Sequence, residues 1–135
     1  GLFNYFEKAG GVMVAETYSA AWSLRLDTSD PIRALALKSL MSYSLVSCLS
    51  IDRRREMVLK ACREYGIDGA VFHQNKSCVP ITLGQADIRR ALADEMGIPS
   101  IVIDADHMDS RNFSMAQFQT RADAFMEMLL EKKGA

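Results

Sequence analysis

The sequence predicts a three-layer α/β domain, in which a parallel β-sheet is flanked by helices as in flavodoxin-like or Rossmann-like folds. Three observations predict it. Short apolar runs of strand length alternate with longer runs of helical period. The short runs are nearly continuous in apolar residues, as in parallel strands buried on both faces. The longer runs begin and end at residues that commonly cap helices.

Three short segments have the composition of buried strands. They are residues 11–16 (GVMVAE), 69–73 (GAVFH) and 100–104 (SIVID). We expect all three in one parallel sheet. A helix precedes the first of them, because Leu2, Phe3 and Phe6 recur at helical spacing. Because a domain of this class that starts with a helix is expected to have lost an upstream strand or domain, we expect residues 1–135 to be one α/β domain, truncated at its N-terminus and forming the C-terminal fragment of a longer subunit.

The first two internal helices are predicted from their ends. Asp30 followed by Pro31 is a typical N-cap and first helical residue, which predicts a helix through Leu40. Residues 42–50 have no clean period, so we expect them to be irregular or weakly helical. A long amphipathic helix is expected from about Asp52 to Gly66, where the glycine ends it.

Two later helices carry the spacing of a capping box. Thr82 and Gln85 have this spacing and predict a helix that ends at Gly97. Ser114 and Gln117 repeat the device for the final helix. In that helix Phe118, Ala122, Phe125 and Leu129 form one inward stripe, and Met126, Met128 and Leu130 widen the apolar surface. We therefore expect part of this helix to pack against another domain or a sister subunit, and the isolated piece to self-associate or to form crystal contacts through it.

Composition and charge exclude several classes of protein. Sixteen basic and seventeen acidic residues give a net charge of -1, which favours neither nucleic acid nor an anionic membrane as partner. No apolar run approaches the roughly 20 residues of a membrane span, and the N-terminus lacks a signal-peptide pattern. We expect a soluble cytoplasmic protein. Three cysteines without CxxC spacing argue against a disulfide framework and against a self-contained zinc site.

Cys78 is the candidate for a special role among the cysteines. It lies between a predicted strand and a predicted helix, near Lys76. The carboxyl edge of a parallel sheet is the usual ligand side, and a helix N-terminus and a cation both favour a thiolate. The pattern leaves two interpretations open, a metal ligand or an ordinary loop cysteine. Cys62 shares an apolar helix face and is expected in the core, and Cys48 is expected to be structural.

Other polar residues at the predicted strand ends have simpler expectations. Residues 16–19 should lie at this edge, and His73 is expected to be a satisfied histidine rather than a ligand or proton donor. Four residues at the end of the third predicted strand resemble a cation site: Asp104, Asp106, His107 and Asp109. They offer fewer oxygen ligands than a hard cation needs, so we expect them to cap loops. An arginine run is expected to be an exposed, solvated helix face; it comprises Arg53, Arg54 and Arg55.

Two stretches resemble the C-terminal part of the 2-hydroxyacyl-CoA dehydratase D-component family, which includes the benzoyl-CoA reductase subunits. They are FEKAGGVMVAETY and YGIDGAVFHQNKSCVPITLGQADIRRALADEMGIPSIVIDADHMDSRNFSMAQFQTRADAFMEML. The resemblance covers nearly the whole chain, with residues 24–50 the least informative. It is specific in combination: a cysteine in an S-C step after a strand, GIP, a strand ending in D-x-D, and Q-x-x-x-R-x-x-A-F-x-E-M.

The resemblance implies a cofactor and partners. In this family two related subunits form a heterodimer, each subunit holds a [4Fe-4S] cluster through three cysteines, and an ATP-hydrolysing activator injects electrons that pass to an acyl-CoA thioester. Cys78 matches the downstream ligand, so it is the cofactor-binding and metal-binding residue that the resemblance implies. The two upstream cysteines of the family are not recognisable here. This fragment alone is therefore expected to lack the cluster and to be inactive.

Three kinds of function are compatible with the sequence. The first is a subunit of an acyl-CoA dehydratase or reductase, and the stretch ADHMDSRNFSMAQFQTR favours the benzoyl-CoA reductase branch. The second is a non-catalytic flavodoxin-like binding module, although no G-x-G-x-x-G or P-loop supports nucleotide binding. The third is an assembly subunit that completes a partner's fold. Two further cysteines in upstream family positions would favour the enzyme.

Overall fold

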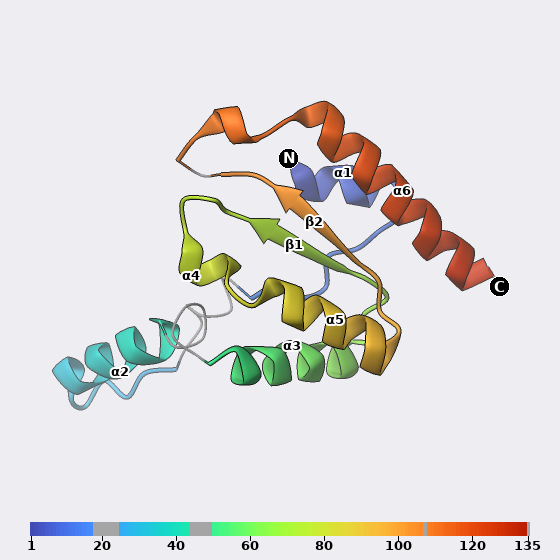
Figure 1. The fold of residues 1–135 in the computed structure, drawn as a ribbon. Coiled ribbons are helices and arrows are strands. Elements are labelled where there is room, and N and C mark those ends of the chain that lie inside the picture. Colours follow the sequence, from blue (N-terminus) through green and yellow to red (C-terminus); the bar gives the residue numbers. More distant parts are fainter. Residues whose placement is uncertain (18–24, 44–49, 107, 135) are drawn as a thin grey trace.

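The protein is described by a computed structural model of residues 1–17, 25–43, 50–106 and 108–134. Within these residues two parallel strands form a sheet: β1 (Ala70–Gln74) and β2 (Ser100–Asp104), paired from Ala70 with Ser100 to Gln74 with Asp104. Helices α1 (Leu2–Lys8) and α6 (Met115–Gly134) cover one face of the sheet, and α3 (Ile51–Tyr65) and α5 (Gln85–Met96) cover the other (Figure 1). The expected three-layer α/β fold is confirmed.

A separate apolar cluster fills each side of the sheet. On one side Ile101 and Ile103 of β2 pack with side chains of α1 and α6; these are Phe6, Phe118, Ala122, Phe125 and Met126. On the other side Ala70 and Phe72 of β1 pack against the second cluster, which comprises Leu59, Cys62, Ile88, Ala91, Leu92 and Ile98. Both faces of the sheet are therefore covered, as the nearly continuous apolar composition of these strands predicts.

The first predicted strand is absent. Residues 11–16 have no regular secondary structure, and the Val12 and Val14 side chains are 77% and 53% exposed. The segment leaves α1 through a turn in which the Gly11 amide donates to the carbonyl oxygen of Phe6, at 2.9 Å. The prediction was wrong because an apolar run forms a strand only where a neighbouring strand pairs with its backbone. Within the described residues, only β1 and β2 pair.

The helix that follows Asp30 is confirmed. Helix α2 (Pro31–Tyr43) begins with the Arg33 amide donating to Asp30 Oδ1 at 3.1 Å. It extends away from the layered body (Figure 1). Of the stretch 42–50, residues 44–49 lie outside the described residues.

Several ends of the helices that flank the strands lie where the sequence predicts them. Ser50 caps α3 by accepting a hydrogen bond from the Arg53 amide, and Gly66 ends the helix in the left-handed conformation. Gly97 ends α5 in the same way. The final helix α6 also starts as predicted, because Ser114 Oγ accepts from the Gln117 amide at 3.5 Å.

The capping box predicted at Thr82 is wrong. Thr82 is the last residue of a one-turn helix, α4 (Val79–Thr82), and its hydroxyl donates to the carbonyl oxygen of Val79 at 3.1 Å. Helix α5 begins three residues later, after Gly84, without a side-chain cap. Gln85 instead donates from Nε2 to the carbonyl oxygen of His73 at 2.9 Å, which ties the start of α5 to β1.

The wide apolar surface of α6 is partly used within the chain. Met126 is buried against α1 and the sheet, so the expectation that it is surplus was wrong. Met128 and Leu130 are 43% and 54% exposed. We still expect these two side chains to contact another domain or a sister subunit.

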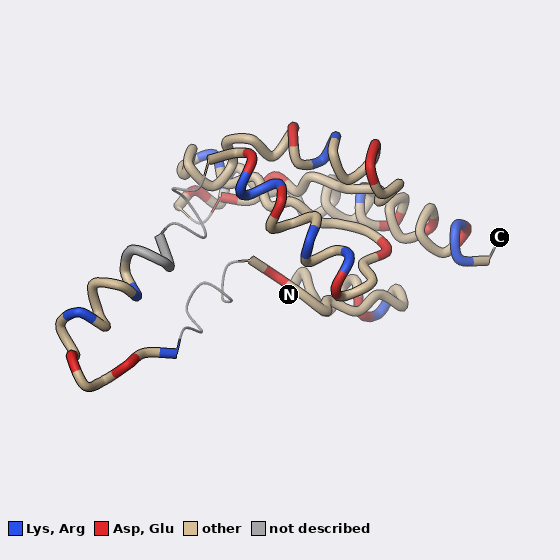
Figure 2. Tube along the Cα trace, turned by 90° about the horizontal axis from the view of Figure 1, so that it is seen from below, with Lys and Arg blue, Asp and Glu red and all other residues tan. Residues whose placement is uncertain are grey.

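Charges of both signs are mixed over the described surface (Figure 2). Lysine, arginine, aspartate and glutamate occur together along the helices. Among the described residues, no helix combines the length and the apolar content that crossing a membrane requires.

Substituting alanine for Gly84 is expected to destabilise the chain by about 2–4 kcal/mol. Gly84 has φ +80°, and an added Cβ would lie 2.9 Å from Ile51 Cγ1. The cost therefore combines backbone strain with overpacking, since both nearest atoms belong to the stiff, branched part of Ile51. Equilibrium urea unfolding measures it. Gly66→Ala is the control, because Gly66 also has positive φ but an added Cβ meets nothing within 4 Å. Equal losses in the two variants would contradict the packing component.

Candidate functional site

Cys78 lies at the carboxyl edge of the sheet. It follows β1 by four residues and ends a turn in which its amide donates to the carbonyl oxygen of Asn75 at 3.1 Å. Cys78 is the N-cap residue of α4, and it is half-buried with a free thiol. The adjoining helix is therefore the single turn that begins at Val79, and not a helix that begins near Thr82. One turn contributes only a weak dipole, so location and access are the notable properties of this thiol.

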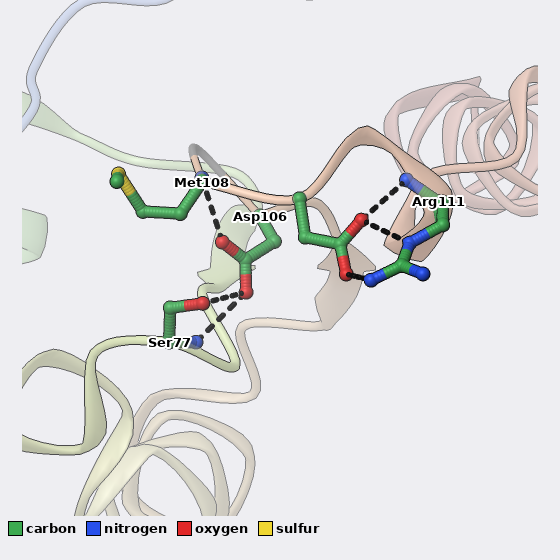
Figure 3. Close-up of polar contacts among 5 residues, drawn as sticks. Ser77, Asp106, Met108 and Arg111 are labelled. Carbon is green, nitrogen blue, oxygen red and sulfur yellow. Dashed lines mark hydrogen bonds and ion pairs between the residues drawn. The ribbon is translucent and has the colours of Figure 1, made fainter.

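A carboxylate on the neighbouring loop holds the residue before Cys78 (Figure 3). Asp106 follows β2, and its Oδ2 accepts hydrogen bonds from the Ser77 amide at 2.8 Å and the Ser77 hydroxyl at 2.6 Å. Its Oδ1 accepts from the Met108 amide at 2.8 Å. The hydrogen bonds from Ser77 and Met108 hold the pKa of the Asp106 carboxyl below its usual value. Asp106 thus bridges the two loops that leave the sheet.

Arg54 holds the other end of the Cys78 segment. It extends from α3 and donates to the carbonyl oxygens of Pro80 at 3.0 Å, Ile81 at 2.9 Å and Leu83 at 2.8 Å. Partial burial lowers the pKa of this guanidinium. The expectation of a merely solvated arginine run was therefore wrong for Arg54. A planar guanidinium with five fixed donors satisfies the last carbonyls of α4, which have no helical partner.

The remaining acidic residues at the end of β2 and in the loop after it pair with arginines or cap the short helix that follows. Asp104 accepts from Arg121 Nη1 at 3.1 Å. Asp109 accepts from the Arg111 amide at 3.0 Å and from the Arg111 guanidinium at 2.8 Å, at the start of the short 3-10 helix Ser110–Asn112. His107 lies outside the described residues. No group of three or more potential ligands for a metal ion occurs among the residues described.

Two further candidates are explained by their surroundings. His73 Nε2 hydrogen-bonds with the carbonyl oxygen of Ala105 beyond the neighbouring strand, so it is the satisfied histidine that the sequence predicts. Glu16 and Thr17 are not placed at the sheet edge by a strand, because residues 11–16 do not form one. Tyr18, Ser19 and Cys48 lie outside the described residues.

Cys62 is buried in the core, as predicted. It belongs to the cluster between β1 and the α3–α5 pair, and burial raises the pKa of its thiol. A hollow of about 360 Å³ lies beside it at the amino edge of the sheet, where Ile67 and Ile98 precede the two strands. Its lining includes Lys132 and Lys133. The hollow is thus at the opposite edge of the sheet from Cys78.

Thiol-reactive probes are expected to modify Cys78 at least about tenfold faster than Cys62 in the folded, metal-free protein. Cys78 is only half-buried, whereas Cys62 is buried and its raised pKa reduces the thiolate population near neutral pH. Timed alkylation with peptide mapping by mass spectrometry measures both rates. Unfolding in urea is the control and should make the two rates similar. Faster modification of Cys62 in the native state would contradict this assignment.

The Asp106–Ser77 and Arg54 contacts were not foreseen from the sequence. Arg54 bonds to residues 26 to 29 positions away, a separation at which spacing carries no signal. The sequence does contain one local indication of the short helix α4. This indication is Pro80, because proline is favoured in the first turn of a helix.

Comparison with known proteins places the chain in a family. The family described as 2-hydroxyglutaryl-CoA dehydratase, D-component, matches residues 1–129. The chain is 32% identical over 127 residues to the (R)-2-hydroxyisocaproyl-CoA dehydratase alpha subunit of Clostridioides difficile, covering 93% of this chain and 30% of that protein. It is 30% identical over 136 residues to a benzoyl-CoA reductase subunit of Thauera aromatica, covering 97% of this chain and 31% of that protein. The chain thus spans about three tenths of the length of these relatives. It belongs to the 2-hydroxyglutaryl-CoA dehydratase D-component family.

Proposed function

We propose that this chain is part of an iron-sulfur subunit of a radical-type acyl-CoA enzyme, either a 2-hydroxyacyl-CoA dehydratase or a benzoyl-CoA reductase. The observation that carries the proposal is Cys78, a half-buried free thiol at the carboxyl edge of the sheet in a chain of this family. The names of the relatives support an acyl-CoA substrate.

The residues present fit a cluster as one donor among several. A thiolate is the ligand that iron-sulfur clusters use, and Cys78 has the required access. Because the described residues contain no complete ligand group, the other ligands would come from outside them. A bound [4Fe-4S] cluster would supply single electrons at low potential to the thioester.

At this edge of the sheet, the chain's own residues would bind the cluster and hold its ligand in place. The Cys78 thiolate would bind one iron, and Asp106 and Arg54 would hold the segment that carries it. Val79 and Leu83 expose apolar side chains on the same segment. Exposed apolar side chains around a ligand thiol favour burial under a further domain, which would keep water from the cluster.

The partners in this proposal are a sister subunit of the same family, an ATP-hydrolysing activator that donates electrons, and the acyl-CoA. The relatives are named as individual subunits of their enzymes, which supports an enzyme of more than one kind of subunit. Because ATP and acyl-CoA thioesters are cytoplasmic compounds, the proposal places the enzyme in the cytoplasm.

The test is an anaerobic assay of the complete subunit with its sister subunit, activator and ATP. Benzoyl-CoA and a series of 2-hydroxyacyl-CoA thioesters are supplied separately, and ring reduction and water loss are followed by mass spectrometry. Turnover of one class that requires ATP and activator supports the proposal and identifies the branch. A complete, iron-loaded complex that turns over neither class would favour a non-catalytic binding or assembly module.

A further inference from the structure

The segment that carries Cys78 is held by side chains from two other parts of the chain. It runs from the turn at Asn75 through α4 to Leu83. Arg54 of α3 donates hydrogen bonds to three carbonyl oxygens near the end of this segment, and Asp106 of the β2 loop accepts from Ser77 near its start. The thiol is therefore placed by tertiary contacts as well as by its local turn.

Of these two side-chain contacts, the one from Asp106 involves the residue next to Cys78 in the sequence. Ser77 directly precedes Cys78, and both of its donors, the amide and the hydroxyl, bond to one carboxylate oxygen. The second oxygen bonds the Met108 amide, so the carboxylate is itself fixed (Figure 3). Strand pairing ends at Gln74 and Asp104, and this bridge connects the two loops beyond it.

The charge of Asp106 adds a second consequence. An ionised carboxylate bonded to the residue before a cluster ligand places a negative charge near the cluster. Added negative charge disfavours reduction, and net charge is one of the properties that set cluster potentials. Hydrogen bonds to an ionised acceptor are also stronger than neutral ones, so the carboxylate form suits the holding role.

We propose that Asp106 is a positioning residue for Cys78, which fixes the thiol through Ser77 and lowers the reduction potential of the cluster bound there. This inference rests on the proposed function, since it assumes that Cys78 is a cluster ligand. It assigns to Asp106 a role distinct from Asp109, which lies on the same loop and bonds Arg111.

The test uses Asp106→Asn in the complete subunit together with its sister subunit. Asparagine is nearly isosteric but is neutral and cannot accept both sets of hydrogen bonds. We expect Cys78 in the metal-free variant to react with thiol probes roughly five- to tenfold faster, because Cys78 is half-buried and becomes more exposed when its segment is no longer held through Ser77. In the iron-loaded variant we expect the midpoint potential of the cluster to shift to a more positive value.

Matched variants isolate the cause. Asp109→Asn removes the same charge from the same loop without touching Ser77 and should leave the labelling rate of Cys78 unchanged. Ser77→Ala removes one of the two bonds and should raise the rate less than Asp106→Asn does, and Ser77→Thr should restore it. The effects of Ser77→Ala and Asp106→Asn should not add in the double variant, since the two residues share a contact.

Two results separate this inference from the proposed function. If Cys78→Ser retains full iron, the ligand role fails and Asp106 has no cluster ligand to position. If Cys78→Ser loses iron but Asp106→Asn matches Asp109→Asn in labelling rate and potential, only the role of Asp106 is overturned. The labelling measurement needs no iron and the potential needs no turnover, so neither depends on activity.

Discussion

Cys78→Ser in the complete subunit should remove most of the cluster iron and its visible absorbance. A serine hydroxyl is far less acidic than a thiol and is a poor ligand for iron, so one bond to the cluster would be lost. The fold should survive, because Cys78 is only half-buried and serine differs by one atom. Iron content, iron-sulfur absorbance and the low-temperature electron paramagnetic resonance signal of the reduced protein measure the loss.

Cys62→Ser is the matched control for this experiment. Cys62 lies in an apolar cluster, so the serine hydroxyl would be buried there and should reduce the free energy of unfolding by about 1–3 kcal/mol. Because Cys62 lies toward the amino edge of the sheet, its iron content per folded subunit should stay at the parental level. The two variants should therefore give opposite results. Cys78→Ser should lose iron and keep its fold, whereas Cys62→Ser should keep its iron and be less stable. Unchanged iron in Cys78→Ser would refute the ligand role.

Local sequence signals predicted both strands of the sheet and the ends of the helices that flank them. The strands at 69–73 and 100–104 were found because both combine apolar side chains with a preceding turn, and both have a partner. Glycines at Gly66 and Gly97 ended helices as predicted, since a left-handed residue stops the helix whatever surrounds it. The position of Cys78 at the sheet edge followed from these elements.

Contacts between distant segments could not be predicted in the same way. Residues 11–16 have the composition of a strand, but strand formation depends on a backbone partner that composition does not reveal. Thr82 has the spacing of a cap, yet its hydroxyl bonds backward within α4. Arg54 has the pattern of an exposed charge, yet the approach of α4 gives it three carbonyl acceptors. The three errors have different causes: the lack of a strand partner among the described residues for residues 11–16, a local backbone bond for Thr82, and a tertiary contact for Arg54.

Family membership and structure support the candidate site by different routes. The resemblance selects Cys78 among three cysteines, whereas the geometry shows that Cys78 is half-buried and that its segment is held by Asp106 and Arg54. The proposed ligand role of Cys78 rests on the resemblance, and the residues that hold its segment come from the structure.

The side chain of Phe118 should be among the largest contributors to the stability of the chain. It extends from α6 into the cluster that contains Ile101 and Ile103, and it is 3% exposed. Its ring lies edge-on to Tyr5 and Phe6 of α1, with ring centroids 5.1 and 5.9 Å apart. One ring therefore connects the sheet, the final helix and the N-terminal helix.

Phe118→Ala should lower the free energy of unfolding by about 3–5 kcal/mol, through lost apolar burial and the cavity left between three elements. Equilibrium urea unfolding followed by circular dichroism measures the change. Phe3→Ala is the control, because Phe3 lies on α1 but is 59% exposed, and it should change stability by no more than about 0.5 kcal/mol. Hydrogen exchange of the β2 amides should also accelerate in Phe118→Ala, since this cluster covers one face of that strand. A loss no greater than that of Phe3→Ala would mean that α1 and α6 do not pack on the sheet through this ring.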